Sequence, residues 1–541
     1  MSPLPASNEL LLSIIQDSLE SLADDSTCEG IIDTMKFHVE NCLLYAVTDR
    51  TWLRGQTLEE QVEAALRGGV TMVQLREKDL DKEAFEEEAR RILALCRRYH
   101  VPLLINDNVP LAARVGADGV HVGQNDMSPA EARAILGSSA IVGVTARTVE
   151  QALAAEKAGA DYLGSGAVFG TSTKKDARPM DPAYFREICE SVSIPVVAIG
   201  GITLDNIRSL QGCKMSGFAI VSGIFAAEDI EARSRLLRQA AQDLCLPDYV
   251  EKMRASIESA RPVVQCITNI VTVNDCANAL LAVGASPTMA HHPDEMEEFA
   301  AVSEALVCNM GATESLDAMM RAAKAGTKAG AETLVKTVAE TAAETDAEND
   351  AENCGVPVEK RTAGRPIVID PVGCASSAFR REQCLKLIRQ AGPACIRGNA
   401  AEIRALATGH DTGRGVDDRE KSSLSGFDGS EAVQYAVRLA RQTGAIVVAS
   451  GATDYVTDGD RVYNLQGGSR WMSRVTGTGC MLSSLLGAFM AVDRSPMSAA
   501  ACCAMMNACA EKAAEETAGC RGGLGTFHVR LLDALSGPVE L

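Results

Sequence analysis

Short apolar runs alternate with longer amphipathic stretches through most of the first half of the chain. The runs are four to six residues long and rich in Val, Ile and Leu, which is typical of buried strands. Stretches such as Leu58–Arg67 and Lys82–Arg98 have helical spacing. Eight strand–helix repeats predict a (β/α)8 TIM barrel, with an open doubly wound sheet as the alternative. The expected strands are Leu43–Thr48, Met72–Arg76, Pro102–Asn106, Gly119–Val122, Ile141–Val144, Tyr162–Gly166, Pro195–Ile199 and Gly217–Val221.

The second half repeats this alternation with a different spacing. It predicts a further α/β domain, a mostly parallel sheet covered by helices on both faces. We interpret Gly284–Met289 as a loop. An acidic, Ala-rich stretch at 340–362 and a polar stretch at 409–426 interrupt the pattern and are typical of surface insertions. The expected strands include Val263–Asn269, Ala305–Asn309, Pro366–Asp370, Ala394–Arg397 and Ala445–Ala449.

Three segments follow from these patterns. Residues 1–40 form a helical extension, with amphipathic spacing over Leu10–Leu22. Residues 41–246 form the barrel and residues 247–541 the second domain, with a helix break expected at Leu246–Asp248. The connection is short and not rich in Gly or Ser, so the two halves are not expected to range far apart.

Composition narrows the class of protein. The 541 residues are too many for one core, and the net charge of −20 disfavours nucleic-acid or anionic-membrane binding through bulk charge. We therefore expect small-molecule substrates whose phosphates are held by local donors and metal ions. The eighteen cysteines include no C-x-x-C pair. With no signal-peptide pattern and no apolar run long enough to span a bilayer, this indicates a reduced, cytoplasmic protein.

Polar residues collect where the barrel strands end, the edge that carries the chemistry in such barrels. Asp107 and Asp126 follow neighbouring strands and suit Mg²⁺, which prefers oxygen ligands. The cations Arg76, Lys78 and Lys174 could neutralise a diphosphate. The turns Gly200–Gly201 and Ser222–Gly223 match the usual phosphate site of the fold. A metal, a diphosphate and a separate phosphate indicate a substitution in which diphosphate leaves.

In the second half, Thr476–Cys480 is a glycine-rich turn that runs directly into an apolar helix. Unpaired backbone N–H groups and the helix dipole make such a terminus an anion site. They also tend to lower the pKa of a thiol in the first turn, here Cys480. The alternative is a simple helix cap followed by a buried cysteine. Because no Gly-Lys-Ser/Thr follows, the turn is not a Walker P-loop.

Further strand ends suggest how a phosphoryl donor is held in this half. Asp370 and Glu402 could hold Mg²⁺, although Glu402 alone could also be a first-turn helix acid. Arg397 could meet the phosphates of ATP, or could form an ordinary surface ion pair. Cys480 would then face the acceptor alcohol.

The first half resembles thiamine-phosphate synthase over roughly residues 40–240. The motifs that carry the resemblance are Gln74–Lys78, Ile105–Asp107, Gly116–Gln124, Thr171–Lys175 and Ala198–Gly201. This family joins thiazole phosphate to 4-amino-2-methyl-5-hydroxymethylpyrimidine diphosphate and releases diphosphate. The resemblance implies that Gln74, Arg76, Lys78, Asn106, Thr145 and Lys174 bind the pyrimidine diphosphate, that Asp107 and Asp126 bind Mg²⁺, and that Thr171, Ser172, Thr173, Gly201, Val221 and Ser222 bind thiazole phosphate.

The second half resembles hydroxyethylthiazole kinase, of the ribokinase-like fold, over roughly residues 255–535. The carrying motifs are Gln265–Asn269, Ser286–Met289, Asp370–Gly373, Arg397–Glu402 and Thr476–Cys480. The family transfers the ATP γ-phosphate to 4-methyl-5-(2-hydroxyethyl)thiazole, usually as a trimer with the thiazole site between subunits. The resemblance implies that Met289 and Gly477 bind the thiazole, that Arg397 and Ser450 bind ATP, and that Cys480 is the catalytic base.

Both resemblances point to one pathway, because the product of the kinase is a substrate of the synthase. We therefore predict a bifunctional enzyme of thiamine biosynthesis and salvage that uses Mg²⁺ and ATP and forms a trimer or a multiple of it. One alternative is a synthase fused to hydroxymethylpyrimidine kinase, a family whose opening Ala-Gly-Ser-Asp-type motif is not found near residue 263. The other is a thiazole or thiamine sensor without turnover.

Overall fold

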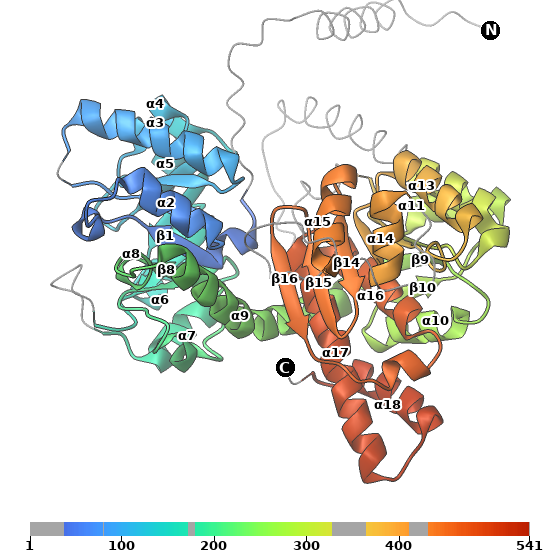
Figure 1. Cartoon of the computed structure of the whole chain (residues 1–541). Helices are drawn as coiled ribbons and strands as arrows, with labels where there is room; N and C mark the ends of the chain where they lie inside the picture. The colour runs from blue at the N-terminus through green and yellow to red at the C-terminus, as the bar shows by residue number, and fades with distance from the viewer. Residues whose placement is uncertain (1–36, 79, 171–178, 327–363, 410–430, 540) are drawn as a thin grey trace, which may run out of the picture.

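The computed structural model describes residues 37–78, 80–170, 179–326, 364–409, 431–539 and 541. Two α/β units lie side by side and are joined by one long helix, α9 (Ile230–Ala260) (Figure 1). Residues 1–36 of the expected extension, the acidic insertion at 340–362 and residues 410–426 of the polar stretch lie outside the described ranges.

The first unit is a closed barrel of eight parallel strands in sequence order, as predicted. Its strand residues are almost all buried because the interior is filled by side chains and helices cover the outside. The strands are β1 (Leu44–Val47), β2 (Met72–Leu75), β3 (Leu103–Asn106), β4 (Gly119–Val122), β5 (Ile141–Thr145), β6 (Tyr162–Gly166), β7 (Val196–Ile199) and β8 (Gly217–Ile220).

Local signals fix where the barrel helices begin. Thr57 and Glu60 form a capping box before α2, and Ser128 and Glu131 form another before α5. These caps end the loops that leave the carboxyl ends of the strands, so they help to fix the mouth of the barrel. The helical elements are η1 (Val39–Cys42), η2 (Arg50–Trp52), α2 (Leu58–Arg67), α3 (Lys82–Arg98), α4 (Val109–Val115), α5 (Pro129–Leu136), α6 (Val149–Lys157), α7 (Pro182–Ser191), η3 (Ile207–Leu210) and α8 (Ser222–Phe225).

The second unit is built on an eight-stranded sheet with the order β10-β9-β11-β12-β13-β14-β15-β16. Six neighbouring strands are parallel, and β15 and β16 join antiparallel at one edge. The sequence pattern missed this hairpin, and Ser286–Thr288 is a short edge strand rather than part of a loop. The strands are β9 (Val263–Ile267), β10 (Ser286–Thr288), β11 (Ala305–Asn309), β12 (Ile367–Asp370), β13 (Cys395–Asn399), β14 (Ile446–Ser450), β15 (Thr453–Thr457) and β16 (Val462–Gln466).

Alternating side chains divide this sheet between two cores. In β14, Ile446 and Val448 belong to the core under α16 and α17, whereas Val447 and Ala449 belong to the core on the opposite face. Both faces are therefore covered, as predicted. The helical elements are α10 (Val273–Ala282), η4 (Pro293–Glu295), α11 (Met296–Val302), η5 (Thr313–Ser315), α13 (Ala378–Ala391), α14 (Ala400–Thr408), α15 (Glu431–Thr443), η8 (Met472–Arg474), α16 (Thr478–Val492), α17 (Pro496–Gly519) and α18 (Leu524–Ser536).

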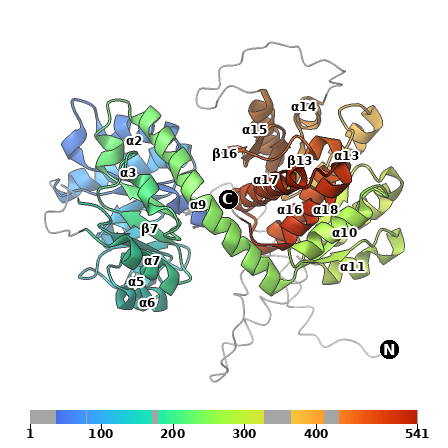
Figure 2. The same cartoon turned by 90° about the horizontal axis from the view of Figure 1, so that it is seen from below.

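Helix α9 is the last helix of the barrel and also leads into the second unit (Figure 2). The predicted break at Leu246–Asp248 is wrong, because Pro247 lies inside a continuous helix. Pro247 removes one backbone hydrogen bond, but the turns on either side of it are buried against different partners. The proposed boundary near residue 247 therefore falls within a shared helix rather than in a linker.

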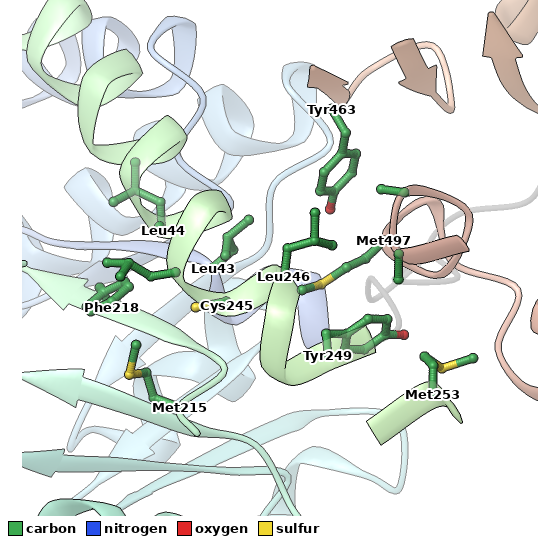
Figure 3. Close-up of a cluster of buried hydrophobic side chains, with 14 of the residues drawn as sticks. Leu43, Leu44, Met215, Phe218, Cys245, Leu246, Tyr249, Met253, Tyr463 and Met497 are labelled. Atoms are coloured by element: carbon green, nitrogen blue, oxygen red, sulfur yellow. The ribbon is translucent and has the colours of Figure 1, made fainter. Parts of the chain in front are cut away.

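The contact between the units is apolar (Figure 3), and a buried charge lies beside it. Around Leu246 and Tyr249, the barrel residues Leu43 and Phe218 and the second-unit residue Met497 belong to one buried cluster. Glu40, which is fully buried, pairs with the Arg461 guanidinium and accepts the backbone N–H of Met497 in the first turn of α17. Glu40, which lies just before β1, thus links the barrel to the residue before β16 and to α17 in the second unit.

We predict that Glu40→Ala destabilises the whole chain by about 3 kcal/mol, because it leaves the Arg461 charge and the Met497 N–H with a lost partner in a buried place. Urea denaturation followed by circular dichroism measures the loss. The control is Asp243→Ala, which removes the exposed ion pair with Arg208 and should cost less than about 1 kcal/mol. Equal losses in the two variants would show that the contacts of Glu40 stabilise the chain no more than an exposed ion pair does.

Candidate functional site

The mouth of the barrel holds a cavity of about 280 Å³ at the carboxyl ends of the strands. Ten residues that the sequence singled out line it, although they come from six different strand ends. They are Gln74, Arg76, Lys78, Asn106, Asp107, Asp126, Thr145, Gly201, Val221 and Ser222. Thr171, Ser172, Thr173 and Lys174 lie outside the described residues.

Two carboxylates border this cavity. Asp107 has left-handed backbone (φ +60°) and accepts a 2.6 Å hydrogen bond from the Asn106 amide. Asp126 accepts the backbone N–H of Gly123 at 2.8 Å, which fixes its loop. Among the described residues no group of three His, Cys, Asp or Glu side chains is arranged to hold a metal. Two carboxylates fit Mg²⁺, because this ion usually takes one or two carboxylates and completes its shell with water and substrate phosphates.

Part of the cavity wall is backbone at which a side chain would clash with its neighbours. Gly201 has φ +66°, and a Cβ there would lie 2.3 Å from the carbonyl oxygen of Gly170. The Ser222 side of the wall follows directly after β8. Close, side-chain-free backbone next to a hydroxyl suits a phosphate group.

Beneath the cavity lies a hydrogen-bonded chain that the sequence did not reveal. Gln74 donates to the Tyr45 hydroxyl at 2.5 Å, and the Tyr45 and Tyr162 hydroxyls lie 2.9 Å apart. His121 joins Tyr162 through Nδ1 (2.9 Å) and Thr145 through Nε2 (3.0 Å). This chain holds the amide of Gln74 and the hydroxyl of Thr145 in fixed places. The inward positions of Tyr45 and Tyr162 in their strands were the only signal for it.

A second site lies where α16 begins. Gly477 precedes the helix with left-handed backbone (φ +95°), and Gly479 lies in its first turn. A Cβ on Gly479 would come within 2.5 Å of the Arg397 guanidinium. Arg397 also donates to the Ser450 hydroxyl at 2.6 Å. A guanidinium and a helix N-terminus thus face the same space, which is the arrangement that binds an anion. Met289, expected at the thiazole, directly follows the edge strand β10.

Cys480 is half-buried in the first turn of α16 and its sulfur is held by two amides. Asn309 donates to Cys480 Sγ at 3.1 Å, and Asn269 donates to it at 3.6 Å. The same Asn309 nitrogen donates to Asp370 Oδ2 at 3.0 Å. Sequence reasoning missed Asn309, although it is the last residue of β11, at the same sheet edge as Asp370.

The expectation of a lowered thiol pKa at Cys480 is wrong. Burial is the largest influence and Asp370 is the next, and together they raise the pKa of Cys480 to about 11. Hydrogen bonds from Thr272 and Asn309 oppose this rise without overcoming it. In the protein without its substrates, Cys480 is therefore a thiol at neutral pH.

The two carboxylates of this half have different surroundings. Asp370 is fully buried, accepts Ser483 Oγ at 2.8 Å, and keeps Oδ1 without a partner among the described residues. Burial raises the pKa of Asp370 to about 6, against the lowering effect of Arg397. Glu402 instead accepts two backbone N–H groups, from Gly373 and Asn399. The unpaired oxygen of Asp370 fits a cation, whereas Glu402 also caps α14, as the alternative interpretation held.

Comparison with known families matches both halves. Residues 44–224 match the family model of thiamine monophosphate synthase. Residues 255–353 and 356–539 match that of the hydroxyethylthiazole kinase family. The match leaves residues 225–254, most of helix α9, between the two models.

Two fungal proteins are similar to the chain over nearly its whole length. A probable thiamine biosynthetic bifunctional enzyme of Schizosaccharomyces pombe is 33% identical over 526 residues, covering 91% of this chain and 94% of its own. The thiamine biosynthetic bifunctional enzyme of Saccharomyces cerevisiae is 32% identical with the same coverage. The thiamine-phosphate synthase of Clostridium botulinum is 46% identical over 36% of this chain and 92% of its own. The chain therefore belongs to the family of bifunctional thiamine biosynthetic enzymes that join a thiamine monophosphate synthase to a hydroxyethylthiazole kinase.

Proposed function

We propose that the two sites catalyse consecutive reactions through the residues described above. The second site transfers a phosphoryl group from ATP to the hydroxyethyl oxygen of the thiazole. The barrel then joins thiazole phosphate to the pyrimidine diphosphate, forming thiamine phosphate and diphosphate. The observation that carries this proposal is the convergence of ten sequence-predicted residues on one cavity.

In the barrel, Gln74, Asn106 and Thr145 orient the pyrimidine, while Arg76 and Lys78 bind its diphosphate. Asp107 and Asp126 would hold Mg²⁺, which when bound adds positive charge beside the leaving diphosphate. As the bond from the pyrimidine methylene to the diphosphate oxygen breaks, negative charge grows on that oxygen, where the two cations stabilise it. A neutral ring nitrogen attacks the methylene, so this step needs no general base.

The thiazole phosphate lies against the glycine wall in this proposal. Its phosphate meets the backbone around Gly201 and the Ser222 hydroxyl, with Val221 beside it. Thr171, Ser172 and Thr173 are assigned to the same phosphate, and Lys174 to the diphosphate, by resemblance alone. The support for this placement is that Gly201 and Ser222 line the cavity and that the backbone at Gly201 has no room for a side chain.

In the kinase site, Arg397 and Ser450 bind the phosphates of ATP, while Met289 and Gly477 contact the thiazole. Asp370, with Glu402, would hold Mg²⁺. The alcohol oxygen attacks the γ-phosphorus, the bond to ADP breaks, and the thiolate form of Cys480, a minor form at neutral pH, accepts the alcohol proton. Because phosphoryl transfer has a loose transition state, the proton can leave late, after most of the bond to ADP has broken. The amides of Asn309 and Asn269 donate to the sulfur and stabilise this thiolate form before it takes the proton.

We further propose that the enzyme works in the cytoplasm as a trimer or a multiple of it. All cysteines in the described part of the chain are free thiols, and no described helix has the length and apolar character needed to cross a bilayer. Ile270 and Val271 are 84% and 69% exposed and follow Asn269, which touches Cys480. Two large apolar side chains in water beside a reacting group are typical of a surface that another subunit covers.

The first prediction uses one reaction mixture of thiazole alcohol, ATP, Mg²⁺ and the pyrimidine diphosphate, in which ADP and thiamine phosphate are both measured. Cys480→Ala should lower ADP formation about 100-fold, and supplied thiazole phosphate should restore thiamine phosphate. Asp107→Asn should lower thiamine phosphate formation about 100-fold and leave ADP formation unchanged. If ADP forms only when the pyrimidine alcohol replaces the thiazole alcohol, the second half is a hydroxymethylpyrimidine kinase instead. If neither ADP nor thiamine phosphate forms, the protein is better explained as a thiazole or thiamine sensor without turnover.

The second prediction concerns the protonation of Cys480. Because a thiol pKa raised from 9 to about 11 leaves about 100-fold less thiolate at pH 8, iodoacetamide should label Cys480 slowly there. Labelling should then accelerate up to about pH 11. Peptide-resolved mass spectrometry of the substrate-free protein measures the rate, with exposed Cys520 as the reference in the same digest. Labelling of Cys480 that levels off below pH 9 would contradict the raised pKa.

The third prediction tests the subunit contact. The double variant Ile270→Asp, Val271→Asp should lower the mass in light scattering and raise the KM for the thiazole. Synthase activity with supplied thiazole phosphate should be unchanged. Leu236→Asp is the control, because Leu236 is 55% exposed on α9, away from the kinase site. If the wild type is monomeric, or if Leu236→Asp has the same effect, the trimer proposal fails.

A further inference from the structure

A carboxylate lies within the cation loop of the barrel, which we define as residues 76–78. Glu77 stands between Arg76 and Lys78, yet only those two residues line the cavity. The Glu77 side chain is 4% exposed, and its Oε2 lies 2.5 Å from Arg50 Nε. The negative charge of the loop is therefore turned away from the cavity and is met by an arginine that neither the sequence nor the comparisons pointed to.

Arg50 is itself held on a rigid element. Its Nη2 contacts both carboxylate oxygens of Glu88, on the inner face of α3, whose side chain is 3% exposed. Arg50 thus bridges a loop carboxylate and a helix carboxylate that are both buried. Because Glu88 cannot move without moving α3, the guanidinium gives Glu77 a fixed anchor.

The segment after β1 contacts the cation loop at successive residues. The Thr48 hydroxyl accepts the backbone N–H of Arg76 at 2.9 Å, and Asp49 Oδ2 lies 3.8 Å from the Arg76 guanidinium. Arg50 then forms an ion pair with Glu77, the next residue of the loop. Thr48, Asp49 and Arg50, three consecutive residues after β1, therefore contact the neighbouring loop at its backbone, at the Arg76 guanidinium and at the Glu77 carboxylate, respectively.

This arrangement has an electrostatic consequence for an anionic substrate. Without the positive charge of Arg50, the Glu77 carboxylate would present more negative charge next in sequence to both cations, where it would compete with the diphosphate for their charge. Removal of the Arg50 charge should therefore weaken diphosphate binding more than removal of the Glu77 carboxylate itself. The thiazole phosphate site, on the other wall of the cavity, should be affected much less.

We propose that Arg50 is a positioning residue for the synthase reaction: it holds Glu77 away from the cavity so that Arg76 and Lys78 keep their charge for the diphosphate of the substrate. The proposal rests on the proposed function of the barrel and deepens it. Under this proposal Arg50 touches neither substrate, yet it affects the affinity for the pyrimidine diphosphate and not the affinity for thiazole phosphate.

Steady-state kinetics with the full chain and supplied thiazole phosphate test this. Arg50→Gln should raise the KM for the pyrimidine diphosphate about tenfold, with the KM for thiazole phosphate within twofold of wild type. For Arg50→Lys, the KM for the pyrimidine diphosphate should lie between those of the wild type and Arg50→Gln. Glu77→Gln alone should change the KM for the pyrimidine diphosphate less than threefold. The double variant Arg50→Gln, Glu77→Gln should recover most of the affinity, because the Glu77 carboxylate no longer competes.

Two controls separate this role from general damage to the fold. Arg133→Gln removes an arginine of similar exposure, paired with Asp161, from the barrel without touching the cavity, and should leave both KM values unchanged. Kinase activity of each variant reports folding on the same molecule. Equal rises in both KM values, or a double variant no better than Arg50→Gln, would overturn the proposal. Lack of wild-type synthase turnover would instead reject the proposed function of the barrel.

Discussion

One helix has to satisfy two hydrophobic cores, and this constraint shapes the whole chain. Helix α9 packs on α2 and α8 of the barrel and on α16 and α17 of the kinase half. Its apolar residues are therefore not confined to a single stripe, and neither half can bury its own surface without it. Apolar residues make up the buried contact between the halves, and the Glu40–Arg461 pair adds a charged contact between them at one point.

Parallel strands explain why both halves carry their chemistry at strand ends. In a parallel sheet every strand brings its carboxyl end to the same edge, so residues far apart in sequence converge there. Asp107 and Asn309 each follow or end such a strand. Left-handed backbone occurs at the same edges, at Asp107, Gly201 and Gly477, where a ligand must come close. The rigid sheets make these conformations tolerable because the neighbouring strands hold the loops on both sides.

Sequence patterns predicted the elements that local periodicity determines and missed those that depend on distant partners. The barrel strands and the functional residues at their ends could be predicted, because short apolar runs followed by polar residues repeat regularly along the sequence. The break expected at Pro247 was wrong because the contacts of Tyr249 and Leu246 override a local helix breaker. Arg50 and Asn309 gave no signal of their own, since their importance lies in which carboxylate or sulfur the fold brings beside them.

The case of Cys480 shows how a general rule fails when a larger effect opposes it. A helix N-terminus carries roughly half a positive charge and acts only within the first turn. Burial of the thiol removes the water that would solvate a thiolate, and Asp370 adds negative charge nearby, so both effects favour the neutral form. The donors at the start of α16 remain, but they suit the phosphoryl group of the substrate better than the sulfur. Cys480 can therefore accept the alcohol proton only in its thiolate form, which is a minor form at neutral pH, and Asn309 is placed to stabilise that form.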